Sequence, residues 1–194
     1  PCNRQTPYSH NFLTQDGKPP LEIASIAREQ VAKYDTVEFM HGLATSGAKT
    51  ENGFEIRTAT GESFSARKLI FASGIKDIMP KIEGFAECWG ISALHCPYCH
   101  GYEVRNEATC ILGNGEFGFE FAVLISNWTQ NLKLLTNGES TLTQAQVSML
   151  NKHNITIIET PVVKLEHVNG YLQNVLFNDG TTAAFKALYS RVQF

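Results

Sequence analysis

The sequence predicts an α/β fold with a parallel sheet, and three features support this prediction. A hydrophobic strand at 109–112 leads into Gly113-Asn-Gly-Glu-Phe-Gly118, and a helix follows over 116–128. Strands and helices alternate from residue 108 to 159, which is typical of βαβ units. The nearly all-apolar run 69–72 ends in Ser73-Gly74 and suits a buried parallel strand. Together these features indicate a Rossmann-like architecture.

The N-terminal half is expected to contain one helix and one hairpin. Pro19 and Pro20 fit the first turn of a helix, and apolar residues follow at helical spacing. Asn52-Gly53 favours a tight hairpin turn. In a later connector, Phe85 and Trp89 are expected to pack into a core. In chain order, we expect a loop at 1–18, a helix at 18–33, a strand at 37–40, a hairpin of 43–49 and 54–60, the strand at 69–72 and the connector at 75–95.

The C-terminal half is expected to alternate strands and helices and then to end in extended segments. Thr141 or Thr143 caps the second helix. Asn169-Gly170 and Asp179-Gly180 are expected hairpin turns. The helix at 116–128 carries one stripe of large apolar side chains: Phe117, Phe121, Leu124 and Trp128. The remaining expected elements are strands at 132–135 and 155–159, a helix at 143–153, and extended segments at 162–167, 171–177 and 184–189.

The composition is that of an ordinary globular protein. The chain has 194 residues, of which 43% are hydrophobic and 18% charged, so it can bury a core without a disulfide framework. A net charge of −3 offers no bulk attraction for nucleic acid. No apolar run approaches the ~18 residues of a membrane helix, and the start has no signal-peptide pattern. We therefore expect a cytoplasmic protein with neither a nucleic-acid nor a membrane partner.

The glycine-rich stretch has the form G-x-G-x-x-G, and its position between strand and helix makes the pattern specific. Gly113 permits a tight turn, Gly115 lets a pyrophosphate approach the backbone, and Gly118 lets helix and strand pack closely. The start of the helix then offers N–H groups to phosphates. A plain turn that binds nothing is the alternative. The expected cofactor-binding residues are Gly113, Asn114, Gly115, Glu116, Phe117 and Gly118.

The nucleotide type is decided at the end of the second strand of this unit, because an acidic residue there binds the NAD ribose and a basic one the NADP phosphate. The chain instead has the neutral donors Thr136 and Asn137, with Glu139 slightly later. Neutral donors tolerate a phosphate, so NADP is favoured over NAD by a small margin.

Cys96-Pro-Tyr-Cys99 is a Cys-x-x-Cys, one of the few cysteine patterns with a direct chemical meaning inside cells. Such pairs cycle between dithiol and disulfide. His95 and His100 flank the pair, and His100 is the better candidate for moving a proton. A zinc site or inert thiols are the alternatives, although no second ligand pair exists in the sequence. We expect redox chemistry with no metal, and structural roles for the other cysteines: Cys2, Cys88 and Cys110.

The order of these motifs resembles that of the low-molecular-weight thioredoxin reductases, class II of the pyridine nucleotide–disulfide oxidoreductases. The resemblance rests on Ala72-Ser-Gly74, then Cys96-Pro-Tyr-Cys-His-Gly101, then the loop from Gly113 to Ala122. It implies Rossmann-like FAD- and NAD(P)-binding domains of three-layer ββα type, with the nicotinamide domain inserted into the flavin domain. Residues 1–90 would be a partial FAD-binding domain and 91–194 the NAD(P)-binding domain.

The resemblance also implies roles for single residues. Cys99 would face the flavin, Cys96 would exchange with the outside disulfide, and His100 would occupy the acid/base position. Three polar residues of the first loop would approach the flavin: Asn3, Gln5 and Asn11. The cofactors would be FAD and NADP or NAD, and the full-length protein a homodimer.

The departures from the family pattern affect the expected substrate. His100 replaces the usual aspartate, and residues 136–140 lack the family's basic cluster. The substrate would be a thioredoxin-like protein or a small-molecule disulfide. A dithiol oxidase that uses oxygen, and a non-catalytic nucleotide-binding module, stay open as alternatives. The chain also lacks the family's opening FAD loop and closing Gly-Asp segment. It is therefore expected to be an internal part of a longer protein, and inactive or slow alone.

Overall fold

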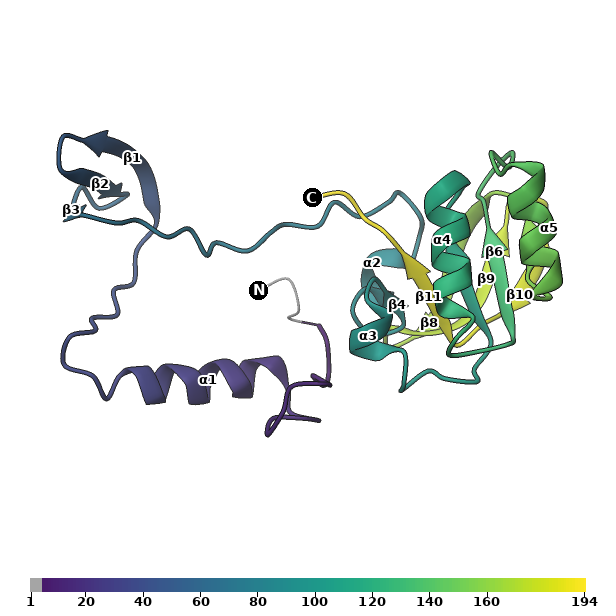
Figure 1. Ribbon diagram of the computed structural model, residues 1–194, viewed down its shortest axis with the longest axis horizontal. Coiled ribbons are helices and arrows are strands. Elements are labelled where there is room, and N and C mark those ends of the chain that lie inside the picture. Colours follow the sequence, from purple (N-terminus) through teal and green to yellow (C-terminus); the bar gives the residue numbers. More distant parts are fainter. Residues whose placement is uncertain (1–4) are drawn as a thin grey trace. The chain divides into compact units, whose positions relative to one another are not determined.

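The computed structural model describes residues 5–194, so Cys2 and Asn3 lie outside the described part of the chain. The chain forms two compact units. The larger unit contains the residues up to Ile23 together with Ile75–Phe194, and the smaller one is Ala24–Gly74. Helix α1 (Pro20–Val31) starts in the first unit and ends in the second. Figure 1 shows the elements of both units.

The larger unit is built on a five-stranded sheet with the order β4-β11-β5-β6-β7. Every neighbouring pair in this sheet is parallel. The structure therefore confirms the predicted parallel α/β architecture. The strands are β4 (Ala93–Leu94), β5 (Thr109–Leu112), β6 (Leu132–Leu135), β7 (Thr156–Ile158) and β11 (Ala187–Ser190).

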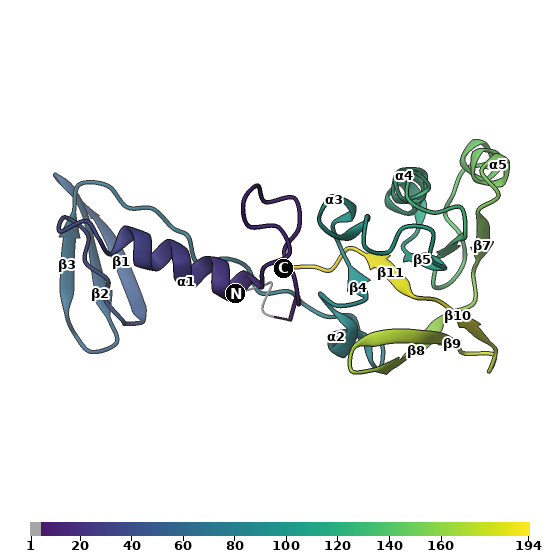
Figure 2. The same cartoon turned by 90° about the horizontal axis from the view of Figure 1, so that it is seen from below.

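Two further layers cover this sheet, and Figure 2 shows them on opposite faces. One is helical, with α3 (Pro97–His100), α4 (Gly115–Ile125) and α5 (Gln144–Lys152). The other holds α2 (Phe85–Cys88) and an antiparallel sheet of β8 (Val162–Val168), β9 (Tyr171–Phe177) and β10 (Thr182–Ala184). This is the three-layer ββα arrangement that the family resemblance implies.

Each face of the parallel sheet has its own hydrophobic core. Between the two sheets, Phe85 and Trp89 pack with side chains of β8 and β9, and both are buried as predicted. On the helical side, Ala122 and Ile125 of α4 pack against Leu134. The fully buried positions of α4 are thus one step beside the predicted stripe, whose large aromatic residues are only partly buried.

The last extended segment is predicted incorrectly as one strand at 184–189. The structure divides it between two sheets, because β10 ends at Ala184 and β11 begins at Ala187. Buried Phe185 lies between them and packs into the core between the sheets. The Asp179-Gly180 turn therefore joins β9 to the short β10, and β11 becomes a central parallel strand.

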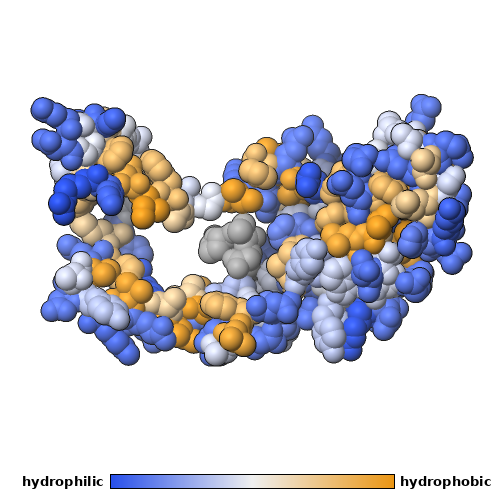
Figure 3. Space-filling view, in the orientation of Figure 1, coloured by the Kyte–Doolittle hydropathy of each residue, from blue (hydrophilic) through white to orange (hydrophobic). Residues whose placement is uncertain are grey.

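The smaller unit contains a three-stranded antiparallel sheet, β1-β2-β3. Strands β1 (Ala44–Thr50) and β2 (Gly53–Thr58) form the predicted hairpin, and β3 (Ser63–Ala66) adds a third strand. Helix α1 buries none of its residues, and Figure 3 shows hydrophobic residues along its surface.

Two predicted strands do not form in this part of the chain. Residues 37–40 and 69–72 are irregular, and no strand of the described chain pairs with either segment. Ile70 and Phe71 are 88% and 82% exposed. Hydrophobicity alone does not make a strand, because a strand needs a neighbour for its backbone hydrogen bonds.

Helix length also bears on membrane insertion. Within residues 5–194, no helix is both long and apolar enough to cross a bilayer.

Candidate active site

The Cys-x-x-Cys lies where the edge strand β4 turns into α3. Cys96 has an extended backbone and precedes Pro97, which occupies the first turn of α3 as its fixed φ allows. One turn of helix then brings Cys99 back to Cys96, and the Cys99 thiol donates a hydrogen bond to the Cys96 sulfur over 2.6 Å. Both are partly buried free thiols. The two predicted redox cysteines are thus adjacent in space.

The surroundings make the two thiols unequal. Burial raises the pKa of Cys99 to about 11, and the hydrogen bond and charge interaction with Cys96 act in the same direction. Cys99 therefore keeps its proton near neutral pH. Its hydrogen bond stabilises negative charge on Cys96. The other described cysteines, Cys88 and Cys110, are fully buried in the core, as predicted.

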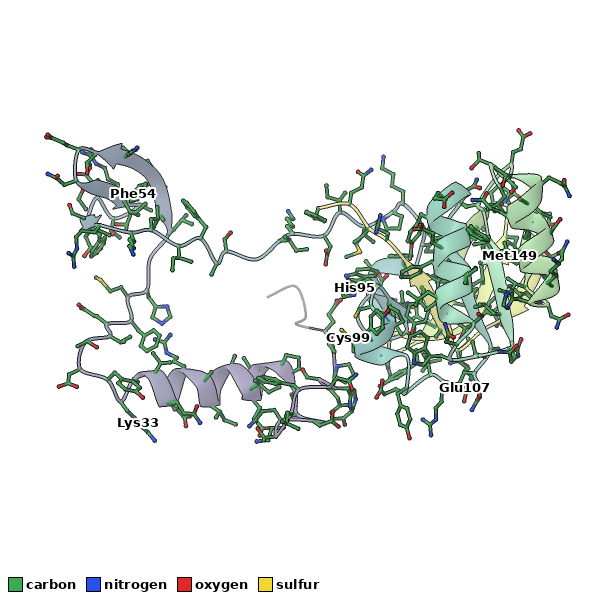
Figure 4. The ribbon with its side chains drawn as sticks, in the orientation of Figure 1. Lys33, Phe54, His95, Cys99, Glu107 and Met149 are labelled. Atoms are coloured by element: carbon green, nitrogen blue, oxygen red, sulfur yellow. The ribbon has the colours of Figure 1, made fainter. Side chains whose placement is uncertain are left out.

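His100 lies beside Cys99 in the wall of a small cavity. Burial lowers its pKa; Glu103 opposes this change, and His10 and His95 add to it. A lowered pKa leaves the imidazole neutral near pH 7, so it can accept a proton. Figure 4 shows His95 and Cys99 close to each other beside α3.

The first loop reaches the dithiol through one predicted residue. The Asn11 side-chain amide donates a hydrogen bond to the Tyr98 carbonyl, inside the Cys-x-x-Cys turn. His10, next to it, lies 3.5 Å from a carboxylate oxygen of Glu103. Gln5 is exposed near Gly90, and Asn3 is outside the described residues.

A cavity of about 220 Å³ opens at this junction. Trp89 and Tyr8 give it aromatic walls, while Asp77 and His95 add polar groups. Trp89 is fixed by a 3.0 Å hydrogen bond from its Nε1 to Asp77. Because Cys99 and His100 also line this cavity, a flat aromatic group bound there would lie beside a thiol and a neutral imidazole. These residues fit the ring of a flavin.

The glycine-rich loop joins β5 to α4 at the carboxyl edge of the parallel sheet, as predicted. Gly115 has φ +55°, and a Cβ there would lie 2.8 Å from the Thr141 hydroxyl. A Cβ on Gly118 would meet the Gly113 carbonyl carbon at 2.9 Å and Leu134 at 3.3 Å. The glycines therefore let the helix approach both its own loop and β6. The cradle fits a dinucleotide pyrophosphate, because α4 begins there and presents its first N–H groups.

The Asn114 side chain links the glycine-rich loop to the loop that follows β6. Its side-chain oxygen accepts hydrogen bonds from Gly115 N at 2.8 Å and Thr141 N at 2.9 Å, while its NH₂ donates to the Glu139 carbonyl at 2.8 Å. Glu116 accepts a hydrogen bond from Gln146 of α5. The predicted residues Asn114 and Glu116 thus hold the loop in shape.

The residues expected to distinguish NADP from NAD have other partners as well. Thr136 is buried, and its hydroxyl donates to the Gly138 carbonyl at 2.7 Å. The Asn137 side-chain oxygen accepts from Val162 N, which leaves its exposed NH₂ group available. We therefore expect the side-chain NH₂ of Asn137 and the backbone at the end of β6 to be the groups that contact a bound nucleotide here.

Two residues of the segment after β10 were not singled out from the sequence. Arg191 follows β11 directly, and its guanidinium lies 5.0 Å from the ring centre of Phe117 in the glycine-rich loop. Tyr189 is buried in β11. Correct division of 184–190 into two strands would have placed both beside β5. No group of three or more metal-ligating side chains occurs within the described residues.

Comparisons with known proteins agree with this geometry. Residues 2–191 match the family described as pyridine nucleotide-disulphide oxidoreductase. The thioredoxin reductase tcpT of Claviceps purpurea is 31% identical over 191 residues, which cover 92% of this chain and 59% of that protein. For the thioredoxin reductase aclD of Aspergillus oryzae the identity is 30%, with coverage of 91% and 60%.

A solved structure gives the same result at the level of the fold. The oxidoreductase from Agrobacterium tumefaciens superposes with a TM-score of 0.90 at 29% identity, covering 100% of this chain and 64% of that one. The chain thus spans about 60% of the length of the curated relatives named above. With the match over residues 2–191, the parallel ββα fold and the paired thiols, the chain belongs to the pyridine nucleotide-disulphide oxidoreductase family.

Proposed function

We propose that this chain carries the redox-active and nicotinamide-binding part of an NAD(P)H-dependent disulfide oxidoreductase. Cys96 and Cys99 alternate between dithiol and disulfide, and the loop Gly113–Gly118 holds the nucleotide. The observation that carries the proposal is the 2.6 Å contact between the two sulfurs beside a cavity that also contains His100.

The unequal thiols support distinct roles. Cys99, with its raised pKa, stays protonated and faces the cavity. Cys96 receives the hydrogen bond, so its thiolate is stabilised and it attacks the outside disulfide. That attack forms a Cys96 mixed disulfide and releases one substrate thiolate. Cys99 then attacks Cys96, releases the second substrate thiolate and closes the 96–99 disulfide. His100 accepts the proton that Cys99 loses.

The cofactors follow from the family and from the fit of the site. Thioredoxin reductases, which this chain resembles, use FAD and NADPH. When bound, FAD supplies two-electron transfer between a nicotinamide and a sulfur pair. Cys99, His100 and Trp89 would contact its ring in the cavity, and the Gly113–Gly118 backbone would hold the nicotinamide nucleotide. The substrate is a thioredoxin-like protein or a small-molecule disulfide.

Mass spectrometry tests the sulfur chemistry. Mild oxidation should remove two hydrogens from the chain and yield one linked peptide that joins Cys96 to Cys99, and dithiothreitol should reverse both changes. Cys96→Ala should no longer lose the two hydrogens. Cys88→Ala should still lose them, because the Cys88 thiol is buried in the core and takes no part in the disulfide. Thiols that stay reduced, or that pair elsewhere, would refute the redox role.

Equilibrium dialysis tests the nucleotide site. NADPH or NADH should bind the chain in a 1:1 ratio, and AMP much more weakly. Absence of binding by both dinucleotides would overturn the role of the loop.

Oxygen uptake driven by a small dithiol without NADPH would instead identify a dithiol oxidase.

A further inference from the structure

Tyr189 is an unusual residue for the centre of this sheet. It lies in β11 with only 1% of its surface exposed, and its ring meets Phe121 edge-on at 6.2 Å. Its hydroxyl is buried, and no hydrogen-bond partner lies near it among the described residues. A buried polar group without a partner is costly, and a phenylalanine would fill the same space without that cost.

The strand register places Tyr189 next to the end of β4, close in sequence to the redox pair. Tyr189 pairs with Leu94 across the parallel β11–β4 contact. Cys96 lies two residues beyond Leu94 and also has an extended backbone. A bend at His95 separates them, and β4 ends at Leu94, so Tyr189 pairs with the last residue of the strand that leads into the redox pair.

Electrostatics gives the same neighbours. Burial raises the pKa of Tyr189, and Cys96, Glu103 and Cys99 raise it further, in that order of size. Both thiols therefore lie within electrostatic reach of the phenol, and Cys96 acts on it more strongly than Cys99 does. His10, His95 and His100 line the same cavity as Cys99 and are the other titratable groups near the pair besides Asp77 and Tyr8.

We propose that Tyr189 is a positioning residue for the redox pair, whose hydroxyl donates a hydrogen bond to Cys96 when that sulfur is a thiolate. The proposal deepens the proposed function, because it rests on Cys96 being the exchanging thiol. Cys99 and Tyr189 then donate to Cys96 from two directions, one from α3 and one from the sheet. The acceptor that the hydroxyl lacks in the fully protonated dithiol is formed when Cys96 loses its proton.

The pH profile of alkylation tests this directly on the 194-residue chain. Tyr189→Phe keeps the shape of the ring and removes only the donor. The pH at which Cys96 reaches half its maximal rate with iodoacetamide should rise by about 0.5–1 unit, since one hydrogen bond to the charged form is lost. Tyr102→Phe is the matched control, because it removes an exposed hydroxyl from the turn that follows α3. Superimposable profiles for Tyr189→Phe and the unchanged chain would overturn the proposal.

Two further measurements separate a positioning role from a merely structural one. In a glutathione redox titration, Tyr189→Phe should favour the disulfide roughly three- to tenfold, because the reduced form loses a stabilising donor. In a Cys96→Ser background, Tyr189→Phe should leave the alkylation of Cys99 unchanged. An effect that persists there, or that Glu103→Gln reproduces in full, would assign the hydroxyl to another acceptor.

These experiments need neither FAD nor a dinucleotide. A failure of the Tyr189 proposal therefore leaves the test of the 96–99 disulfide intact. Circular dichroism and thermal melting verify that Tyr189→Phe folds, and a variant that does not fold would contradict the claim that the phenol serves the thiols rather than the core.

Discussion

The Cys99 thiol lies 2.6 Å from the sulfur of Cys96 and donates a hydrogen bond to it. This hydrogen bond makes the two cysteines chemically different, because Cys99 must keep its proton to donate it. Cys96, the acceptor, is stabilised as a thiolate. Sequence spacing alone brings the two sulfurs together, but it does not say which of them reacts first.

The thiols should differ in reactivity across the pH range. At pH 7–8, iodoacetamide should modify Cys96 and leave Cys99 intact, since the pKa of Cys99 is raised to about 11. In Cys96→Ser, Cys99 should still react slowly below pH 9, because burial is the largest cause of the raised pKa. Peptide mass spectrometry after timed alkylation measures both rates. Faster reaction of Cys99 than of Cys96 would reverse the assigned roles.

His100 should make folding stability depend on pH. Its pKa is lowered in the folded chain from the ordinary 6.5, so the unfolded chain binds a proton more tightly. Stability therefore falls as pH decreases below 6.5 and levels off below the folded pKa. Urea unfolding at pH 7.5 and 5.0 should show a smaller loss for His100→Gln than for the unchanged chain. An equal or larger loss would contradict the burial of this imidazole.

The left-handed backbone of Gly115 can be tested against a matched glycine. Gly115→Ala should cost about 1–2 kcal/mol of stability through its positive φ and weaken NADPH binding at least about tenfold, because its Cβ also meets Thr141. Gly180 has φ +83° with open space around its Cβ position. Gly180→Ala should therefore share the strain and keep the affinity. Equal affinities for both variants would remove the loop from the nucleotide site.

Arg191 should contribute a positive charge to nucleotide binding. It lies at the boundary between β5 and β11, where the order in which strands are added to the sheet switches sides and where such folds bind ligands. No carboxylate lies within ion-pair distance of it in residues 5–194, so its charge is available for phosphate. Arg191→Gln should weaken NADH and NADPH about tenfold alike, since it lies across β5 from the ribose-recognition end of β6.

The control for Arg191 is Arg105, which stacks on exposed Tyr102 at 3.8 Å, outside the glycine-rich loop. Isothermal titration calorimetry with NADH and NADPH measures both variants, and Arg105→Gln should leave the dinucleotide affinity unchanged. If Arg191→Gln also binds normally, the nearby phenylalanine, not a phosphate, is the partner of the guanidinium.

Local chemistry made much of this molecule predictable. Proline at 20, the Asn169-Gly170 turn and the Thr143 cap each act within a few residues, and each element forms as expected. The hairpin of β1 and β2 also forms, but its turn is Glu51-Asn52 and Gly53 already belongs to β2. The glycine-rich loop is similarly local, because its glycines contact their own helix and the next strand.

The remaining parts depend on partners distant in sequence. Residues 69–72 have the hydrophobicity of a buried strand but no neighbouring strand in the described chain. The break between β10 and β11 falls at Phe185-Lys186, without a glycine or proline to mark it. Tyr189 and Arg191 were missed for this reason, since only the register with β4 and β5 reveals what they face.

The central claim is that Cys96 and Cys99 are reduced at the expense of a bound nicotinamide nucleotide. The most direct measurement is the number of free thiols in the oxidised protein, loaded with FAD, before and after anaerobic addition of NADPH. We expect a gain of two thiols, located at 96 and 99 and absent in Cys96→Ser. An unchanged thiol count, with or without bleaching of the flavin, would contradict it.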